Sequence, residues 1–290
     1  MMPMDAPFLQ SSSLPATIRK VPVSGQRDSQ RFEAQDCVAE EVPVALEYNG
    51  VAHAVMLATP ADLADFALGF SLSEGIVESA AEVLALEVMP CEQGWTVQLR
   101  VNARRFAALK ERRRTLAGRT GCGLCGVESL ALAVQPVQPL ATSVRFDARA
   151  VQKALAALGG HQALRAATGA THAAGWARAD GQLVLVREDV GRHNALDKLL
   201  GALLHEGLMA DQGFVVITSR ASYEMVSKSA RVGVALVAAV SGVTGLAIDV
   251  AQQAGVALAG FARGQNLTLY ANAHRIRWGD PEDDAQGPTP

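Results

Sequence analysis

The chain has 290 residues, of which 49% are hydrophobic and 19% are charged, and its formal net charge is −3. This composition is that of a globular protein with one large or two ordinary domains. The near-neutral charge gives no global reason to expect nucleic acid or a membrane as a partner, so any binding of phosphate must come from local sites. Four cysteines in this length do not make a disulfide scaffold.

Both ends of the chain have the composition of unstructured segments. Residues 1–30 are rich in Ser, Pro, Gln and charge, which predicts a flexible arm, and residues 281–290 predict a disordered acidic tail. Residues 1–10 lack the basic and apolar stretches of a signal peptide. Residues 232–250, the one candidate membrane span, are interrupted by Ser, Gly, Thr and Asp. We therefore expect a cytoplasmic protein.

Residues 31–115 are predicted to form a small α/β (α+β) domain. Asn49-Gly50 is typical of a tight hairpin turn because both residues tolerate positive φ, so two paired strands are expected within residues 37–57. Thr59-Pro60 suits an N-cap followed by a first helical residue, which predicts a helix from there to about Ser73. Further strands are expected at residues 83–88 and 95–101.

Residues 116–280 are predicted to form a second α/β domain with a mixed, mostly parallel sheet covered by helices. Strands are expected at residues 183–187, 214–218, 235–240 and 256–261, with helices between them. In open sheets of this kind, ligands bind beyond the carboxyl ends of the strands. The polar loops that follow these strands are therefore predicted to line a ligand cleft: Glu188–Asn194, Ser219–Glu224, Ser241–Thr244 and Arg263–Asn266.

The pair Cys122 and Cys125 is the most informative feature of the sequence. The two thiols lie among three glycines, with a largely basic run before them and a helix-like run after them. Nearby cations and a helix N-terminus both favour the thiolate, which is the reactive form. A nucleophilic or sulfur-carrying thiol fits best, while a redox couple, a zinc site and a structural role stay open. A zinc site would need two further ligands, and the sequence has no second CxxC.

Arg187–Lys198 is a second candidate site, because it concentrates seven ionisable side chains between a strand and a helix. Ion pairs on the solvated surface would not explain why polar residues cluster at the predicted first turn of the helix. Ser219–Glu224 and Arg263–Asn266 suit anion binding, by backbone N–H groups and by a guanidinium beside a glycine. His172 stands alone among small residues and is a weaker candidate. Neither a Walker motif nor GxGxxG is present.

These motifs, in this order, resemble the formate dehydrogenase accessory sulfurtransferase (FdhD) family over about residues 40–275. The matching segments are Glu41–Val44 with Asn49-Gly50, Ala58–Pro60, Gly69-Phe70 with Glu74-Gly75, Cys122–Gly126, Thr171–Ala174, Glu188–Lys198, Ser219–Met225 and Gly260–Gly264. The chain departs from the family pattern at Ser241–Thr244, where Ser-Ala-Pro-Thr is frequent, and at Thr218, where Gly or Ser is usual.

The resemblance implies a cytidine-deaminase-like fold for the second domain and a sulfur carrier required for formate dehydrogenase activity. Such a carrier accepts persulfide sulfur from a cysteine desulfurase. It passes the sulfur to the molybdenum bis(molybdopterin guanine dinucleotide) cofactor before the cofactor enters the formate dehydrogenase catalytic subunit. The resemblance places the persulfide on Cys122, with Cys125 as relay or resolving partner. It places the guanine-nucleotide end of the cofactor at Phe261, Ala262, Arg263, Gly264, Gln265 and Asn266.

The cofactor would be cargo, so we expect no permanently bound cofactor and no metal site. Two other functions stay open: a chaperone that binds the molybdenum cofactor without covalent sulfur chemistry, and a zinc-stabilised structural module. Deamination is disfavoured because His172 is followed by two alanines and the CxxC lacks the preceding proline of zinc deaminases. The sequence does not decide whether the protein is a homodimer or whether the cofactor carries molybdenum or tungsten. It also does not decide whether the last strand returns to the N-terminal unit.

Overall fold

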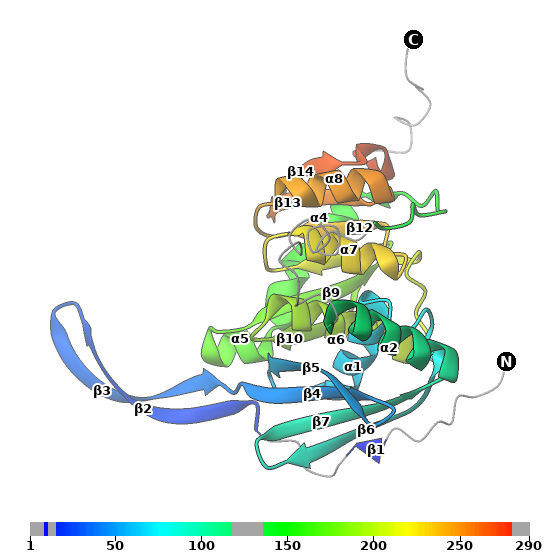
Figure 1. Cartoon of the computed structure of the whole chain (residues 1–290). Helices are drawn as coiled ribbons and strands as arrows, with labels where there is room; N and C mark the ends of the chain where they lie inside the picture. Colours follow the sequence, from blue (N-terminus) through cyan, green and yellow to red (C-terminus); the bar gives the residue numbers. More distant parts are fainter. Residues whose placement is uncertain (1–8, 11–15, 118–135, 280–290) are drawn as a thin grey trace, which may run out of the picture.

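The computed structural model describes residues 9–10, 16–117 and 136–279, which form two packed halves and a projecting ribbon (Figure 1). The elements of the N-terminal half are β1 (Leu9–Gln10), β4 (Val42–Tyr48), β5 (Val51–Ala58), α1 (Leu63–Ser73), η1 (Ala80–Glu82), β6 (Val83–Cys91), β7 (Gly94–Val101) and α2 (Ala103–Ala117). Its strands form a five-stranded sheet in the order β1-β6-β7-β4-β5.

The local predictions for this half are confirmed, except at the start of its first helix. Asn49 and Gly50, both with positive φ, turn β4 into β5 as expected, and the two later strands lie where the sequence placed them. Helix α1, however, begins at Leu63 and not at Pro60. The backbone N–H of Thr59 donates instead to the carboxylate of Asp189 at 2.9 Å, so this residue joins the two halves and caps no helix.

Residues 18–39 form a long antiparallel ribbon of β2 (Ile18–Arg27) and β3 (Gln30–Ala39), which projects away from the body of the molecule (Figure 1). The prediction of a flexible arm is therefore wrong for residues 18–30. Val21 and Val23 alternate with more exposed residues in β2, which is the period-two pattern of a strand with one covered face. The surrounding charges and the proline between the two valines mask this alternation in the sequence.

The C-terminal half is built on a six-stranded sheet. The strands of this half are β8 (Phe146–Asp147), β9 (His172–Arg178), β10 (Leu183–Asp189), β11 (Gly213–Ile217), β12 (Leu236–Ala239), β13 (Ala257–Arg263), β14 (Asn266–Ala271) and β15 (Ile276–Arg277). The order in the large sheet is β10-β9-β11-β12-β13-β14. Four of its strands point the same way, while β9 and β14 run opposite to them. The predicted mixed, mostly parallel sheet is confirmed.

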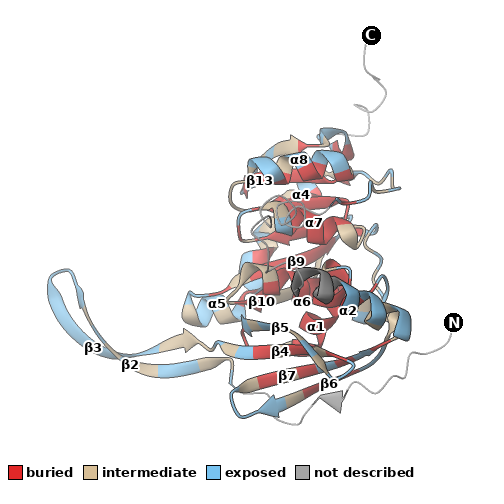
Figure 2. Cartoon of the chain, viewed as in Figure 1, coloured by how far each residue is buried: buried red, intermediate tan, exposed pale blue. Residues whose placement is uncertain are grey.

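Helices cover both faces of this sheet, as the sequence predicted. The helices of this half are α4 (Ala148–Leu158), η2 (Gly159–His161), α5 (Ala163–Thr168), α6 (Arg192–His205), α7 (Tyr223–Arg231), α8 (Gly245–Ala254) and η3 (Ala273–Arg275). Helices α6, α7 and α8 pack on the face that carries Val215 and Ile217, and α4 packs on the face that carries Phe214 and Val216. Much of the sheet between these two layers is buried (Figure 2).

The structure tests two further predictions, for residues 232–250 and for the last strand. The segment 232–250 divides into β12 and part of α8, as predicted. The last described strand, β15, pairs with β8 of the C-terminal half and does not return to the N-terminal sheet. Within the described ranges, none of the helices has the length and apolar character needed to cross a membrane.

The two halves meet where α1 crosses α6, and a glycine on each helix lets the backbones touch. A Cβ atom at Gly69 of α1 would lie 1.7 Å from the carbonyl oxygen of Asp197. A Cβ atom at Gly201 of α6 would lie 1.8 Å from the carbonyl oxygen of Asp65. Real Cβ atoms do not approach other heavy atoms this closely, so only glycine fits at either position. The contact fixes the N-terminal half against the sheet that carries the candidate site.

Candidate functional site

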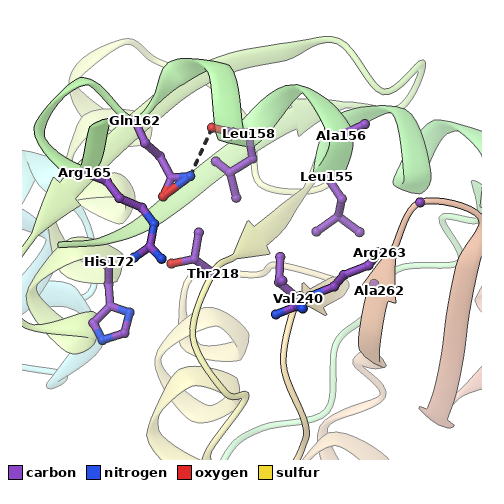
Figure 3. Close-up of a pocket in the computed structure, with 12 residues that line it drawn as sticks. Leu155, Ala156, Leu158, Gln162, Arg165, His172, Thr218, Val240, Ala262 and Arg263 are labelled. Atoms are coloured by element: carbon purple, nitrogen blue, oxygen red, sulfur yellow. Dashed lines mark hydrogen bonds between the residues drawn. The ribbon is translucent and has the colours of Figure 1, made fainter. Parts of the chain in front are cut away.

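A cavity of about 430 Å³ lies at the carboxyl edge of the C-terminal sheet, between the strand ends and the last turns of α4 (Figure 3). The carboxyl ends of β11, β12 and β13 contribute Thr218, Val240 and Arg263. The full lining is Leu155, Ala156, Leu158, Gly159, Gln162, Arg165, His172, Thr218, Val240, Ala262, Arg263 and Gly264. The predicted position of the ligand cleft, beyond the ends of these strands, therefore coincides with a cavity, but of the four predicted loops only Arg263–Asn266 contributes lining residues.

The charged residues that line the cavity are basic. Figure 3 shows Arg165 and Arg263 on opposite sides of Thr218 and Val240, with His172 beside Arg165. Burial lowers the pKa of His172, and the nearby charges of Arg192 and Arg165 lower it further. No acidic side chain is among the lining residues that the structure describes. Two guanidinium groups without a lining carboxylate favour an anionic ligand.

The side-chain oxygen of Gln162 is a buried hydrogen-bond acceptor that no described residue satisfies. Its side chain is only 7% exposed, and its amide nitrogen donates a long 3.5 Å bond to the carbonyl oxygen of Leu158. The side-chain oxygen has no hydrogen-bond partner among the described residues. A buried acceptor left unpaired costs roughly 1–3 kcal/mol, so a donor on a ligand would stabilise this arrangement. Sequence reasoning missed this residue, because the segment Gly159–Gln162 matches no binding motif.

The family resemblance assigned residues 261–266 to the cofactor. This segment forms the turn from β13 into β14, and only part of it lines the cavity. Ala262, Arg263 and Gly264 line the cavity. Phe261 has a φ of 50° and is exposed, and its ring lies over Gly242. Gln265 accepts a 2.7 Å hydrogen bond from Gln152 of α4 through its carbonyl oxygen.

The remaining residue of that segment, Asn266, begins β14 and pairs with Arg263. Gly242 belongs to the departure from the family pattern noted above, and it gives the ring of Phe261 room that a larger residue would restrict. The cofactor role of residues 261–266 stays a prediction.

Glu188 holds Arg165 in place from outside the cavity. Its carboxylate accepts from the backbone N–H groups of Leu164 and Arg165 at 2.8 and 2.9 Å, and from the hydroxyl of Thr171 at 2.9 Å. Arg165 in turn donates to the carbonyl oxygen of Thr171 at 3.0 Å. Helix α5 has only six residues, so these bonds to its first turn fix it on the sheet edge.

The candidate site Arg187–Lys198 does not line the cavity, and most of its polar residues connect the two halves instead. Lys198 and Asp189 form a fully buried pair at 2.7 Å. The ammonium group of Lys198 also donates to the carbonyl oxygen of Thr59 at 2.9 Å, and Asp189 accepts from the backbone of the same residue. Arg187 donates to the carboxylate of Asp65 on α1 at 2.7 and 3.0 Å. These residues join the two halves, and a ligand role for the segment stays a prediction.

A second buried cluster connects the halves at the far end of α1. Lys228 of α7 contacts Asp197 and Glu74, each at 2.9 Å, and the hydroxyl of Ser73 donates to Asp197 at 2.6 Å. Burial alone would lower the pKa of Lys228, but the carboxylates of Asp197 and Glu74 outweigh burial and raise it. Lys228 therefore keeps its positive charge. Asp197, a residue of the candidate segment Arg187–Lys198, thus helps to hold the two halves together.

Cys122 and Cys125 lie outside the described residues, as do the helix-like run that follows them and the acidic tail. Of the described cysteines, Cys37 is half-buried on β3 and Cys91 is exposed at the end of β6. Within the part of the chain that the structure describes, no group of three His, Cys, Asp or Glu residues is placed to hold a metal ion.

Comparison with known proteins assigns the family. The model of the FdhD/NarQ family matches residues 39–277. The chain belongs to the FdhD/NarQ family. It is 52% identical to a protein of Variovorax paradoxus named sulfur carrier protein FdhD, over 90% of this chain and 94% of that protein. A protein of the same name from Bordetella petrii is 54% identical, over 83% of this chain and 87% of that protein.

A solved structure shares the fold of this family member. The crystal structure of a putative formate dehydrogenase accessory protein from Desulfotalea psychrophila superimposes with a TM-score of 0.72, covering 90% of this chain and all of that one. The two sequences are 22% identical, so this likeness concerns the fold alone. The family resemblance inferred from the motifs is confirmed.

Proposed function

We propose that the chain is a sulfur carrier that delivers sulfur to the molybdenum bis(molybdopterin guanine dinucleotide) cofactor for formate dehydrogenase. The observation that carries the proposal is the family match over residues 39–277, which includes the CxxC pair and whose curated relatives are named sulfur carriers. The basic cavity at the sheet edge, with Arg263 in its lining, supports a bound phosphorylated ligand.

In the loading step, the thiolate of Cys122 attacks the outer sulfur of a persulfide on a cysteine desulfurase. The bond between the two donor sulfurs breaks, the donor leaves as a thiolate, and Cys122 becomes a persulfide. Sulfur transfers between thiols in this way without net oxidation, because the donor loses the same sulfane sulfur that the acceptor gains. The basic residues that precede the pair in the sequence would favour the attacking thiolate.

In the release step, Cys125 attacks the inner sulfur of the Cys122 persulfide. A disulfide forms between the two cysteines, the outer sulfur leaves as hydrosulfide, and the proton of the Cys125 thiol goes with it to the cofactor. The disulfide is two electrons more oxidised than the dithiol. A thioredoxin-class dithiol therefore has to reduce it before the next cycle.

The cavity would hold one nucleotide end of the cofactor. Its volume of about 430 Å³ lies toward the small end of ligand pockets, roughly 300–1,000 Å³, so it suits a single nucleotide better than the whole cofactor. Arg165 and Arg263 would bind phosphate, and Gln162 would accept a hydrogen bond from a base or ribose donor.

The sulfur chemistry is tested by loading the protein with a desulfurase and cysteine and measuring the intact mass. We expect the wild type and Cys91→Ala, the matched control with an exposed cysteine removed, to gain the mass of sulfur, and Cys122→Ala to gain none. Full loading of Cys122→Ala would contradict the proposal. Restored formate dehydrogenase activity with both Cys122 and Cys125 changed to alanine would favour the non-covalent chaperone.

The nucleotide site is tested separately with GDP as a probe of one cofactor end. Loss of a charge-assisted hydrogen bond is worth roughly 1.5–3 kcal/mol, so Arg263→Ala should weaken GDP binding at least about ten-fold in calorimetry. Arg178→Ala, which removes an exposed cation at the opposite end of β9 from His172, should leave binding unchanged. Equal binding by both variants would place the nucleotide elsewhere.

A further inference from the structure

A row of cationic side chains continues from the cavity, past the strand ends, to the start of α6. Arg165 and His172 lie beside each other in the cavity lining (Figure 3). His172 begins β9 and stands opposite Asp189, the last residue of β10. Helix α6 begins three residues later, at Arg192. We call Arg165, His172 and Arg192 the cationic row.

The side chain of His172 points away from α4, the helix that lines the cavity. The residues after it on β9 alternate between the faces of the sheet, because Ala173 packs in the core beside α4 and Ala174 packs in the core beside α6. By the same alternation, His172 lies on the α6 side. Figure 3 shows its ring directed away from the turn of α4 that carries Leu158. His172 therefore connects the cavity with the start of α6.

The charges of the row also show that Arg192 lies near the cavity. Burial lowers the pKa of His172, and the charge of Arg192 lowers it further, by more than the charge of Arg165 does. The carboxylate of Asp189 opposes these effects, and its contribution is the smallest. The interaction between charges weakens with distance, so Arg192 is close to the imidazole although it is not a lining residue.

Arg192 carries a buried donor without an acceptor. Its Nε atom is buried and has no hydrogen-bond partner in the described part of the chain. The neighbouring carboxylates are engaged elsewhere. Asp189 is paired with Lys198 at 2.7 Å, and a carboxylate oxygen of Glu224 lies 2.6 Å from Nε2 of His193. An unsatisfied buried donor is costly, so an anion beside Arg192 would stabilise the arrangement.

The start of α6 favours an anion as well. The helix has 14 residues, and no side chain caps its first turn. Backbone N–H groups and the helix dipole attract phosphate at such a position. A helix start alone identifies no ligand. Here it adjoins Arg192 and a cavity in which Gln162, only 7% exposed, holds an acceptor that no described residue satisfies.

We propose that the cavity and Arg192 together bind a diphosphate group, with one phosphate at Arg165 and Arg263 and the second beyond His172 at Arg192. The ligand class is then a nucleoside diphosphate or its ester, and Arg192 selects it over a nucleoside monophosphate. This inference rests on the proposed function, in which the cavity holds a nucleotide end of the cofactor. It adds a direction: whatever is esterified to the second phosphate continues on the α6 side of the sheet edge.

Calorimetry with GDP and GMP, in buffer without divalent cations, tests the selection on the full chain. The wild type should bind GDP at least about ten-fold more tightly than GMP, because the second phosphate adds a charge-assisted hydrogen bond. Arg192→Gln should weaken GDP binding by about ten-fold and leave GMP binding within about two-fold of wild type. Arg178→Ala, which removes an exposed cation at the other end of β9, should keep the preference.

Arg263→Ala separates this inference from the proposed function. Arg263 lines the cavity, so its loss should weaken GDP and GMP binding alike. A wild type that binds neither nucleotide would overturn the nucleotide site of the proposed function, and this inference with it. If the wild type binds both, an unchanged preference in Arg192→Gln, or an equal loss for both nucleotides, would overturn the role of Arg192 alone.

Unfolding without nucleotide shows whether Arg192 acts in the fold instead. Because its buried Nε lacks a partner, Arg192→Gln should keep the melting temperature of the wild type. Saturating GDP should then raise the melting temperature of the variant less than that of the wild type, since ligands stabilise according to their affinity. A variant that melts well below the wild type without nucleotide, and gains as much from GDP, would contradict the proposal.

Discussion

Replacing Gly69 by alanine is the sharpest test of how the two halves are joined. The added Cβ atom would lie 1.7 Å from the carbonyl oxygen of Asp197 and 2.7 Å from the backbone nitrogen of Gly201. Both neighbours are backbone atoms of α6, so no side-chain rotation can relieve the overlap. Helices α1 and α6 must separate to make room, and the buried ion pairs beside them must shift as well.

The magnitude follows from the size of that displacement. Non-bonded atoms in contact prefer a separation of about 3.5–4.0 Å, so the helices must move apart by roughly 2 Å. A gap of about half that size already removes a quarter to a half of the van der Waals attraction at each contact. Overpacking of this kind costs about 1–3 kcal/mol and occasionally more. Alanine's better helix propensity returns about 1 kcal/mol. Because the overlap is with backbone atoms that cannot rotate away, we take the upper end of the overpacking range, about 3 kcal/mol, and expect a net loss of about 2 kcal/mol.

The assay is thermal and urea unfolding of the purified variant beside Gly245→Ala. Gly245, the first residue of α8, has no atom within 4 Å of an added Cβ, so alanine there should be neutral or slightly stabilising. At roughly 2–4 °C per kcal/mol, Gly69→Ala should lower the melting temperature by about 4 °C or more. Equal melting of the two variants would refute the contact between the helix backbones.

Three further outcomes are expected. Lys198→Met should destabilise the protein by about 3–5 kcal/mol in urea unfolding, since Asp189 would be left as an uncompensated buried charge. GDP binding should strengthen as pH falls from about 7.5 to 6, because a bound phosphate raises the lowered pKa of His172 and the complex takes up a proton. In calorimetry, His172→Gln should remove most of this pH dependence. Gln162→Leu should weaken GDP binding without loss of melting temperature, whereas a drop in both would show that Gln162 acts mainly in the fold.

The regular elements could be predicted because their signals are local. The turn Asn49-Gly50 and the apolar runs that became β10, β11, β12 and β13 lie within a few residues of their predicted positions. Strand β9 was missed, since its sequence from His172 to Arg178 is mostly alanine and glycine with one tryptophan. Small residues suit its place between two neighbours but carry little strand propensity.

The roles of the charged residues could not be read from local sequence. A charged residue such as Arg187 or Asp197 looks the same in the sequence whether it binds a ligand or joins the two halves of the protein. What decides is a partner far along the chain: Asp65 lies 122 residues before Arg187, and Ser73 lies 124 residues before Asp197. The position of the cavity was predictable from the order of strands. Arg165, however, enters the cavity from the short helix α5 and Gln162 from the residue before it, and no sequence pattern indicated this helix.

The distance in sequence between the partners of the interface also bears on how the chain is made. A ribosome adds about 5–20 residues per second, so α1 emerges roughly 6–25 s before the segment of α6 that contains Asp197. Throughout that interval the side of α1 that carries Gly69 and Ser73 has no second helix to cover it. In the nascent chain that side of α1 therefore stays in contact with solvent until the second half has been synthesised.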